Sequence, residues 1–283
     1  MDELREKISI CCKELKLSSN FADKAFKMDG DTPQEYLLNL LSNEIETRAE
    51  NRKIRYLNFA GFPRRYRKEE FSTDEVIFPE GTSFESLLNL DFYRAGKNII
   101  MYGSSGTGKT MLSILIGMSA CMQDIPVKFF RTAGLINEFS ESKRSGSLSK
   151  LKKRLNRAEI LILDEFGYVP YDRMGAQLLF DYLSEILILD EFGYVPYDRM
   201  GAQLLFDYLS EIHEQKSVIL NTNLEFSQWV NVLYDQMMTT ALIGRLTHHV
   251  DLILFPGVNH RLRESSINRA LTKISDLQAG SNR

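Results

Sequence analysis

The sequence lacks the features that mark membrane or secreted proteins. No stretch approaches the roughly 18 uncharged apolar residues that a membrane-spanning helix requires. The opening residues, MDELREKISI, contain no basic segment followed by an apolar run, as a signal peptide would. The only cysteines, Cys11, Cys12 and Cys121, have neither CxxC nor zinc-ligand spacing, which argues against a disulfide framework. We therefore expect a cytoplasmic protein without a membrane partner.

The chain also lacks a strong excess of charge of either sign. Its 35 basic and 38 acidic residues leave a net charge of −3, so any contact with nucleic acid must come from local patches. Residues 48–68 hold eight bases and one acid, with aromatic residues between them, and residues 143–157 hold seven bases and no acid. A solvated charged surface would explain either patch, and contact with DNA phosphates is the alternative that we carry forward. The candidate DNA-binding residues are Arg48, Arg52, Lys53, Arg55, Arg64, Arg65, Arg67, Lys68, Lys143, Arg144, Lys150, Lys152, Lys153, Arg154 and Arg157.

The pattern of apolar residues predicts two unequal domains. Residues 1–57 are expected to be helical, because Thr32 and Glu35 form a capping box around Pro33 and apolar residues follow at helical spacing. Residues 58–90 contain glycines, prolines and bases, and predict a basic linker. Residues 91–268 alternate short apolar runs with helical patterns, which predicts an α/β domain with a parallel sheet covered on both faces, followed by a tail at 269–283. The expected strands are 98–102, 127–130, 160–164, 186–190, 218–221 and 250–254.

The sequence contains a perfect tandem repeat. LILDEFGYVPYDRMGAQLLFDYLSEI at 161–186, the first copy, recurs letter for letter at 187–212, the second copy. Repeats in solenoid proteins diverge and need several copies to bury a core, so two identical copies indicate either a recent natural duplication or an artificial one. We expect an ancestral protein 26 residues shorter, with one strand–turn–helix unit in place of two.

A phosphate-binding loop follows the first predicted strand. Residues 103–110, GSSGTGKT, match the pattern G-x-x-x-x-G-K-[ST] between an apolar strand and a helical run. In this motif backbone N–H groups surround the phosphates, the lysine reaches the β- and γ-phosphates, and the last hydroxyl binds Mg²⁺. The sequence therefore predicts ATP and Mg²⁺ as cofactors. The expected nucleotide-binding residues are Gly103, Ser104, Ser105, Gly106, Thr107, Gly108, Lys109 and Thr110, the last also a metal ligand.

An acidic pair ends the predicted strand ILILD. Asp164 is expected to hold Mg²⁺ and Glu165 to polarise the attacking water, although a solvated acidic turn would look similar. The repeat supplies a second pair, Asp190 and Glu191, and only one pair can lie beside Lys109. Local sequence does not decide between them; we prefer the first pair, because N-terminal segments tend to fold first. The displaced copy is then expected to form a bulge, an added edge strand or an exposed surface.

With these motifs, the chain resembles the IstB family of insertion-sequence transposition helpers, which are AAA+ ATPases related to the DnaC-type helicase loaders. The resemblance covers about residues 58–268 and is carried by DEFGY, GAQLLFDYLSE, NTNLEFSQW, ALIGRLTHHV and HRLRES. It implies an AAA+ P-loop fold and three further site residues. Asn223 resembles the sensor that contacts the attacking water or γ-phosphate, Arg245 the arginine finger that reaches a neighbouring subunit, and Arg261 a second sensor of bound nucleotide. A turn asparagine and a solvated helical arginine are the ordinary alternatives for the first two.

The resemblance also implies partners and a mechanism. An IstB-like protein would assemble on double-stranded DNA as a homo-oligomer with ATP sites between subunits, and would recruit and stimulate a cognate transposase before hydrolysis releases it. A DnaC-type helicase loader is the nearest alternative. A different alternative is a DNA scaffold that binds ATP without hydrolysing it, because the repeat has displaced the acidic pair; a poorly folding product of the duplication is a third.

Overall fold

The computed structural model describes residues 2–166, 186–193, 199–212 and 217–257. The chain divides into two compact units, Met1–Asn58 and Phe59–Arg283. Each unit has its own buried apolar core, and the nucleotide-binding motifs lie in the second unit.

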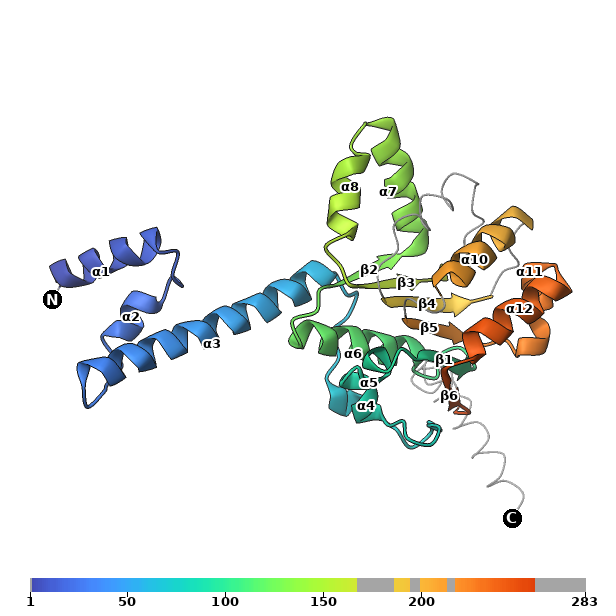
Figure 1. Ribbon diagram of the computed structural model, residues 1–283, viewed down its shortest axis with the longest axis horizontal. Helices are drawn as coiled ribbons and strands as arrows, with labels where there is room; N and C mark the ends of the chain where they lie inside the picture. Colours follow the sequence, from blue (N-terminus) through green and yellow to red (C-terminus); the bar gives the residue numbers. More distant parts are fainter. Residues whose placement is uncertain (1, 167–185, 194–198, 213–216, 258–283) are drawn as a thin grey trace, which may run out of the picture. The chain divides into compact units, whose positions relative to one another are not determined.

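The first unit is helical, as predicted. Its helices are α1 (Asp2–Glu14), α2 (Phe21–Ala25) and most of α3 (Pro33–Ala60) (Figure 1). The predicted capping box is confirmed: the Glu35 backbone N–H donates to Thr32 Oγ1 at 3.2 Å, and the Thr32 N–H donates to Glu35 Oε2 at 3.1 Å. A small core of Cys12, Phe21, Ala22 and Leu40 joins the three helices.

The second unit contains a six-stranded sheet of order β2-β3-β4-β5-β1-β6, in which every neighbouring pair is parallel. Each strand lies within two residues of a predicted one, so the expected α/β sheet is confirmed. The strands are β1 (Asn98–Gly103), β2 (Val127–Arg131), β3 (Ile160–Asp164), β4 (Ile186–Phe192), β5 (Ser217–Thr222) and β6 (Val250–Phe255).

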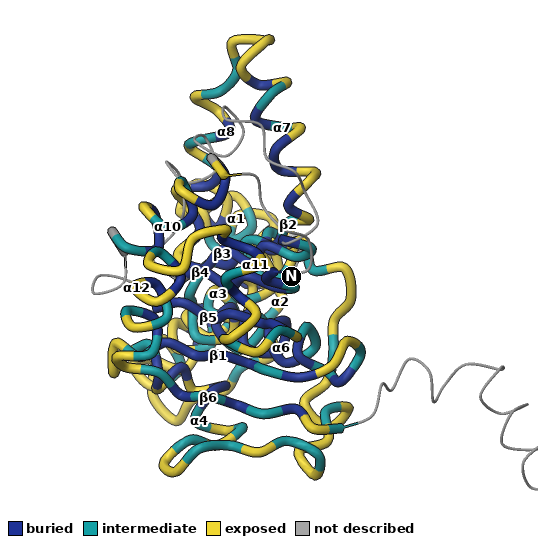
Figure 2. The backbone as a smooth tube through the Cα atoms, turned by 90° about the vertical axis from the view of Figure 1, so that its right-hand side faces the viewer, coloured by how far each residue is buried: buried dark blue, intermediate teal, exposed yellow. Residues whose placement is uncertain are grey.

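Helices cover both faces of this sheet (Figure 1). On one face, α6 (Lys109–Met122) packs over the central strands, and the missing Cβ of Gly117 lets it approach Ile162 of β3. On the other face, Leu161, Leu163 and their copies Leu187 and Leu189 enter a core formed with the opposite helices. Figure 2 shows the strands as the most continuously buried part of this unit. The other helices of the unit are α4 (Phe84–Leu88), α5 (Asp91–Arg94), α7 (Thr132–Arg144), α8 (Leu148–Leu155), α10 (Arg199–Ile212), α11 (Val230–Leu233), α12 (Gln236–Thr247) and the short 3₁₀ helices η1 (Lys68–Glu70) and η3 (Phe226–Gln228). Among the described residues, the structure contains no helix long and apolar enough to span a membrane.

The two copies of the repeat lie side by side in the sheet. Strand β3 pairs with β4 in a register that joins equivalent residues, such as Leu161 with Leu187 and Ile162 with Ile188. The expectation of a bulge, an edge strand or an exposed surface was wrong, because β3 is a buried interior strand between β2 and β4. The sheet accepts it because ILILD is apolar on both faces, as interior strands of covered parallel sheets are.

The segment predicted as a linker is part of the second unit from Phe59 onward. Ile77 forms an antiparallel bridge with Leu254 of β6, with N···O distances of 2.9 and 3.0 Å between their backbone groups. Further along, Leu87, Leu88 and Leu90 are buried. The glycines and prolines of this segment therefore form turns in a stretch of chain that packs against the second unit, not in a linker between domains.

Candidate functional site

The phosphate-binding loop connects β1 to α6, as its sequence predicts. Gly106 and Gly108 have φ values of 80° and 105°, which glycine adopts without strain. A Cβ on Gly103 would collide with the backbone carbonyl oxygen of Phe255, so the close approach of β6 also requires glycine. The buried Lys109 donates from Nζ to the carbonyl oxygens of Gly103 at 2.6 Å and Ser104 at 2.7 Å. These bonds hold its ammonium group directly beneath the loop.

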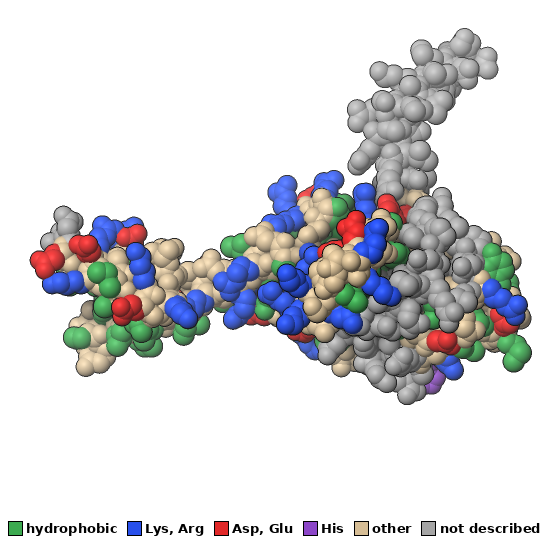
Figure 3. All heavy atoms as spheres, turned by 90° about the horizontal axis from the view of Figure 1, so that it is seen from above, with side chains coloured by type: hydrophobic (Ala, Val, Ile, Leu, Met, Phe, Trp, Pro, Cys, Tyr) green, Lys and Arg blue, Asp and Glu red, His purple; other side chains and the backbone are tan. Residues whose placement is uncertain are grey.

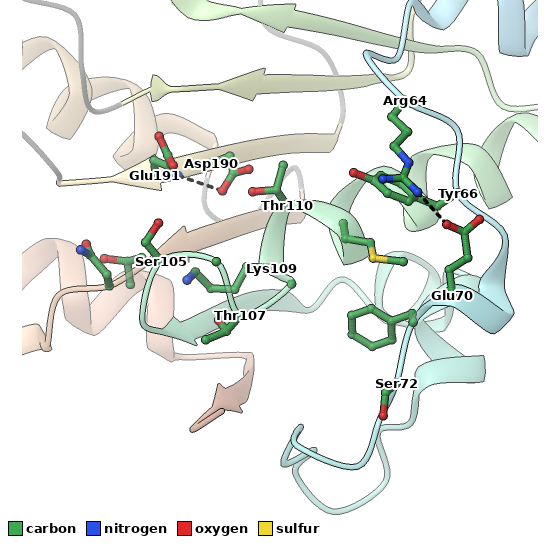
Figure 4. Close-up of a pocket in the computed structure, with 16 residues that line it drawn as sticks. Arg64, Tyr66, Glu70, Ser72, Ser105, Thr107, Lys109, Thr110, Asp190 and Glu191 are labelled. Atoms are coloured by element: carbon green, nitrogen blue, oxygen red, sulfur yellow. Dashed lines mark hydrogen bonds and ion pairs between the residues drawn. The ribbon is translucent and has the colours of Figure 1, made fainter. Parts of the chain in front are cut away.

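A pocket of about 460 Å³ opens over this loop (Figure 4). Its volume lies within the range of about 300–1,000 Å³ that is usual for small-molecule sites. The loop and the first turn of α6 form one wall, with Lys109 and Thr110 labelled in the figure. Opposite them lie the ends of β4 and β5, and a third wall comes from residues 64–72. Of the predicted nucleotide-binding residues, Gly103 and Ser104 do not line this pocket, and the other six do.

The acidic pair in the pocket is the one that the second copy supplies. Asp190 and Glu191 line it, whereas Asp164 and Glu165 do not. This corrects the preference for the first copy. The physical reason is connectivity: β3 follows α8 and pairs with β2, whereas β4 pairs with β5, whose other neighbour is β1, the strand that carries the loop. Local geometry does not distinguish the pairs, since both glutamates have left-handed φ values, 55° for Glu165 and 58° for Glu191.

Asp190 has the surroundings of a metal-binding carboxylate. It is 1% exposed, and its Oδ1 accepts hydrogen bonds from the Glu191 backbone N–H and from Asn221 Nδ2, each at 3.0 Å. Its buried Oδ2 accepts none from the described residues. Thr110 points into the same pocket with its hydroxyl (Figure 4). One carboxylate and one hydroxyl, together with phosphate oxygens, form the kind of oxygen set that Mg²⁺ takes at a nucleotide site, so these residues fit the ion.

Asp164 lies one strand further from the loop in a different electrostatic environment. Burial raises the pKa of its carboxyl group to about 7, and the negative charges of Asp190, Glu165 and Glu191 add to the shift. Its backbone carbonyl oxygen accepts a hydrogen bond from Thr132 Oγ1 at 2.8 Å. Glu165 extends toward Arg131 at the end of β2, with 4.0 Å between Oε1 and Nε. Asp164 and Glu165 thus contact the start of α7 and the end of β2, and neither lines the pocket over the phosphate loop.

The third wall of the pocket comes from residues that the sequence analysis did not assign to it. They are Arg64, Tyr66, Glu70, Phe71 and Ser72. Arg64, predicted to bind DNA, donates from Nη2 to Glu70 Oε2 at 3.0 Å, and its guanidinium lies 4.7 Å from the Tyr66 ring centre. Phe71 stacks on Phe84 with 5.1 Å between ring centres and lies next to Gly108. Aromatic residues in a segment rich in glycine, proline and bases were the only signal, and it equally fits a DNA-binding linker.

The three site residues implied by family resemblance have different surroundings. Asn223 is exposed at the end of β5 and lines the pocket. Arg245 on α12 is outside it; its Nη1 hydrogen-bonds with Ser210 Oγ, and its guanidinium lies 5.1 Å from the ring centre of Phe206, both on α10. Arg261 lies outside the described residues.

The basic residues at 143–157 lie on the hairpin of α7 and α8 and the turn after it (Figures 1 and 3). Lys143, Arg144, Lys150, Lys153 and Arg157 are exposed, and Lys152 and Arg154 are half-buried.

This patch meets the other predicted patch at Phe59. The Arg157 guanidinium lies 5.4 Å from the ring centre of Phe59, and Lys128 Nζ donates to the Phe59 carbonyl oxygen at 2.7 Å. Lys128, which the sequence analysis did not select, also lies 5.5 Å from the ring centre of Phe130, and Arg154 lies 5.6 Å from the same centre. Burial, and then the charge of Arg154, lower the pKa of Lys128. These contacts place bases from two parts of the chain, β2 and residues 154–157, around two aromatic rings.

Comparison with known proteins identifies the family. The family described as IstB-like ATP binding protein matches residues 19–186 and 182–268, two segments that meet at the junction of the two copies. The chain belongs to this family. It is therefore an ATP-binding protein with a P-loop α/β fold, and the recognition made from the motifs is confirmed.

Individual relatives agree with this assignment. The chain is 27% identical over 230 residues to the insertion sequence IS232 putative ATP-binding protein of Bacillus thuringiensis subsp. berliner, covering 81% of this chain and 82% of that protein. It is 30% identical over 187 residues to the insertion sequence IS21 putative ATP-binding protein of Pseudomonas aeruginosa, covering 66% and 61%. Among solved structures, the DnaC helicase loader is similar with a TM-score of 0.39 and 17% identity over 61% of this chain and 85% of that one.

Proposed function

We propose that this chain is an Mg²⁺-dependent ATPase that assembles on double-stranded DNA and acts as the helper of an insertion-sequence transposase. The observation that carries the proposal is the single pocket shared by the phosphate loop, the acidic pair Asp190–Glu191 and Asn223. A strand-end carboxylate pair facing a P-loop provides a metal ligand and a group that can polarise the attacking water, as phosphoryl transfer to water needs.

In this proposal the loop backbone and Lys109 bind the phosphates of ATP. The Lys109 ammonium exchanges the carbonyl oxygens of Gly103 and Ser104 for β- and γ-phosphate oxygens, which lie within reach of a side chain already held beneath the loop. Thr110 and Asp190 hold the Mg²⁺, which neutralises charge on the phosphates when bound. Tyr66 and Phe71 supply apolar surface on the far side of the loop, where the base of the nucleotide would lie.

Hydrolysis requires a water aligned with the γ-phosphate. Glu191 is half-buried and lines the pocket, and we assign to its carboxylate the polarisation of that water. Asn223, exposed at the same edge, is positioned to hydrogen-bond to the water or to the γ-phosphate. Glu165 lies outside the pocket and has no catalytic role in this proposal.

Arg245 is assigned to the ATP site of a neighbouring subunit. It does not line the pocket of its own chain, so a catalytic role requires a second copy. Its bond to Ser210 uses one of the five N–H groups of the guanidinium, and in this proposal other N–H groups donate to the γ-phosphate of the neighbouring site. Such an arginine makes turnover depend on assembly.

Contact with DNA is assigned to the basic residues of α8 and to those around Phe59. Exposed bases on the protruding hairpin of α7 and α8 (Figure 1) suit the phosphate backbone, which supplies affinity without sequence choice. The role beside a transposase rests on membership of the family and on relatives named for insertion sequences.

The proposal is tested by ATP hydrolysis with and without duplex DNA, at several protein concentrations, for the wild type, Glu191→Gln and Glu165→Gln. We expect Glu191→Gln to lower kcat about 10²–10⁴-fold, as loss of a general base does, and Glu165→Gln to stay within a few-fold of the wild type. The specific activity of the wild type should rise with DNA and with protein concentration.

Two other outcomes are informative. If only Glu165→Gln abolishes turnover, the first copy supplies the catalytic pair and the assignment to Glu191 is wrong. If the wild type binds ATP and DNA but does not hydrolyse ATP under any condition, the chain is an ATP-dependent DNA scaffold rather than an ATPase.

A further inference from the structure

A buried asparagine connects the phosphate-loop helix to the metal-side aspartate. Asn221 lies on β5, is fully buried, and follows the apolar residues Val218–Leu220. Its Nδ2 donates one hydrogen bond to Ser113 Oγ of α6 at 2.8 Å and one to Asp190 Oδ1 of β4 at 3.0 Å. Both N–H groups of the amide are therefore used between the two elements that form opposite walls of the pocket.

These bonds fix the direction in which Asp190 faces. Oδ1 receives two donors, the Asn221 amide and the Glu191 backbone N–H. The Asp190 carboxylate cannot rotate without losing both of these hydrogen bonds, so its Oδ2 stays turned away from the two donors. Oδ2 is buried and accepts no hydrogen bond from the described residues, which is costly for a carboxylate oxygen unless a cation uses it.

A purely structural role accounts poorly for this residue. The Oδ1 of Asn221 also has no hydrogen-bond partner among the described residues, so its amide is only partly satisfied at full burial. An aliphatic residue would fill a position between apolar strands without that penalty. The chain retains a polar side chain where its one clear effect on the pocket is the orientation of Asp190.

The contact is possible only for the second copy. In the sheet β5 is flanked by β1 and β4, so Asn221 meets Asp190, while Asp164 lies on the strand beyond. Two aspartates of identical local sequence therefore differ in whether an amide orients them.

We propose that Asn221 is a positioning residue for Mg²⁺: it holds Oδ1 of Asp190 so that Oδ2 faces the metal bound with ATP. This inference rests on the proposed assignment of Asp190 as a metal ligand. Asn221 touches neither nucleotide nor metal and acts through Asp190.

The test measures binding of a fluorescent ATP analogue to the full chain, in EDTA and across a Mg²⁺ titration. For Asn221→Leu, which keeps the volume and removes the amide, we expect affinity in EDTA within about twofold of the wild type. The Mg²⁺ concentration that gives half of the maximal increase in affinity for the analogue should rise about tenfold, as loss of a hydrogen bond to a charged group predicts. If Asn221→Leu fails to fold, as judged by circular dichroism, Asn221→Ala replaces it with the same expectations.

Two further variants distinguish orientation of Asp190 from packing. Ser113→Ala removes the other partner of the Asn221 amide and should leave the Mg²⁺ response unchanged. Adding the Asn221 substitution to Asp190→Asn should cause no further loss, because the residue through which Asn221 acts is already altered. The inference is overturned if the Asn221 variant responds to Mg²⁺ like the wild type, if Ser113→Ala reproduces its effect, or if the two losses add.

The readout separates this inference from the proposed ATPase activity. If the wild type binds the analogue more tightly with Mg²⁺ but never hydrolyses ATP, the ATPase proposal fails while the comparison of Asn221 variants still holds. If Mg²⁺ does not tighten binding to the wild type, the positioning role is overturned whatever the rate of hydrolysis.

Discussion

Asp164 and Asp190 have the same neighbours in sequence and different neighbours in space. Asp190 accepts a hydrogen bond from Asn221 at Oδ1, and its buried Oδ2 accepts none from the described residues. Asp164 is largely buried and lies near three negative charges, and its burial, followed by these charges, raises its pKa to about 7. The duplication has thus left Asp190 with a hydrogen bond from a side-chain amide, and Asp164 in a position where its negative charge is unfavourable.

This difference predicts how stability depends on pH. The unfolded pKa of an aspartate is about 3.9, so the folded chain retains a proton at Asp164 over about pH 4–7 that the unfolded chain has lost. The free energy of unfolding should therefore fall as pH rises through this window. Asp164→Asn removes the ionisable group, and we expect it to stabilise the chain by ~1–2 kcal/mol at pH 8, allowing for partial solvent screening, and to leave stability at pH 4 unchanged.

Thermal unfolding at pH 4, 6 and 8 measures this effect. The exposed Asp207 on α10 provides the matched control, because Asp207→Asn should give the same small shift at each pH. If Asp164→Asn changes the unfolding temperature equally at pH 4 and pH 8, a raised pKa of Asp164 is not the cause of that change.

At the scale of elements, the duplicated strand widens the sheet, and the strands on its two sides pair with equivalent positions of β3 and β4. Val127 of β2 pairs with Ile160 at the start of β3, while Ser217 of β5 pairs with Ile186, which holds the equivalent position at the start of β4. Removing one copy would therefore let β2 and β5 flank a single strand with both existing registers preserved.

Deletion of 187–212 tests this equivalence, and deletion of 161–186 yields the same sequence. We expect a folded chain with a five-stranded sheet that binds ATP with affinity within a few-fold of the full chain. Circular dichroism and ATP binding provide the measurements. Deletion of only 187–199 breaks the repeat unit and should not fold; if the full-unit deletion fails in the same way, the inserted strand has become essential to the core.

Much of this arrangement was predictable from sequence, and the exceptions have physical causes. The strands and the phosphate loop were found because apolar runs, glycines and the Lys-Thr pair are local signals. The choice between Glu165 and Glu191 was not, because identical sequences carry no information about which strand they will pair with. Tyr66 and Phe71 were missed because the segment around them has the composition of a linker, although the domain itself holds it in place.

At the scale of the molecule, a chain of net charge −3 presents a concentrated basic surface on its second unit. In the proposed function this surface binds DNA through its phosphates, so the affinity for DNA should fall steeply with salt. For the variant with Lys150, Lys153 and Arg157 all changed to alanine, we expect about 10–100-fold weaker binding to duplex DNA at low salt. The plot of log association constant against log salt concentration should become less steep, with the magnitude of its slope smaller by about 2–3.

Fluorescence anisotropy with duplexes of two unrelated sequences measures both quantities. Arg94→Ala with Arg199→Ala provides the control, because these exposed bases lie on α5 and α10, outside both patches. An unchanged salt slope in the triple variant would mean that the hairpin is a solvated surface and that DNA contacts another part of the chain.

The pairing of β3 with β4 also has a consequence for association between copies of this chain during folding. Identical strands aligned in parallel and in register normally require separate chains, as in cross-β assemblies, where each strand is a template for the next. Here one chain holds two such strands, and either fits the place of the other. During folding, a strand from a second molecule can therefore take the neighbour's position without any mismatch, so exchange between chains competes with correct folding more strongly as concentration rises.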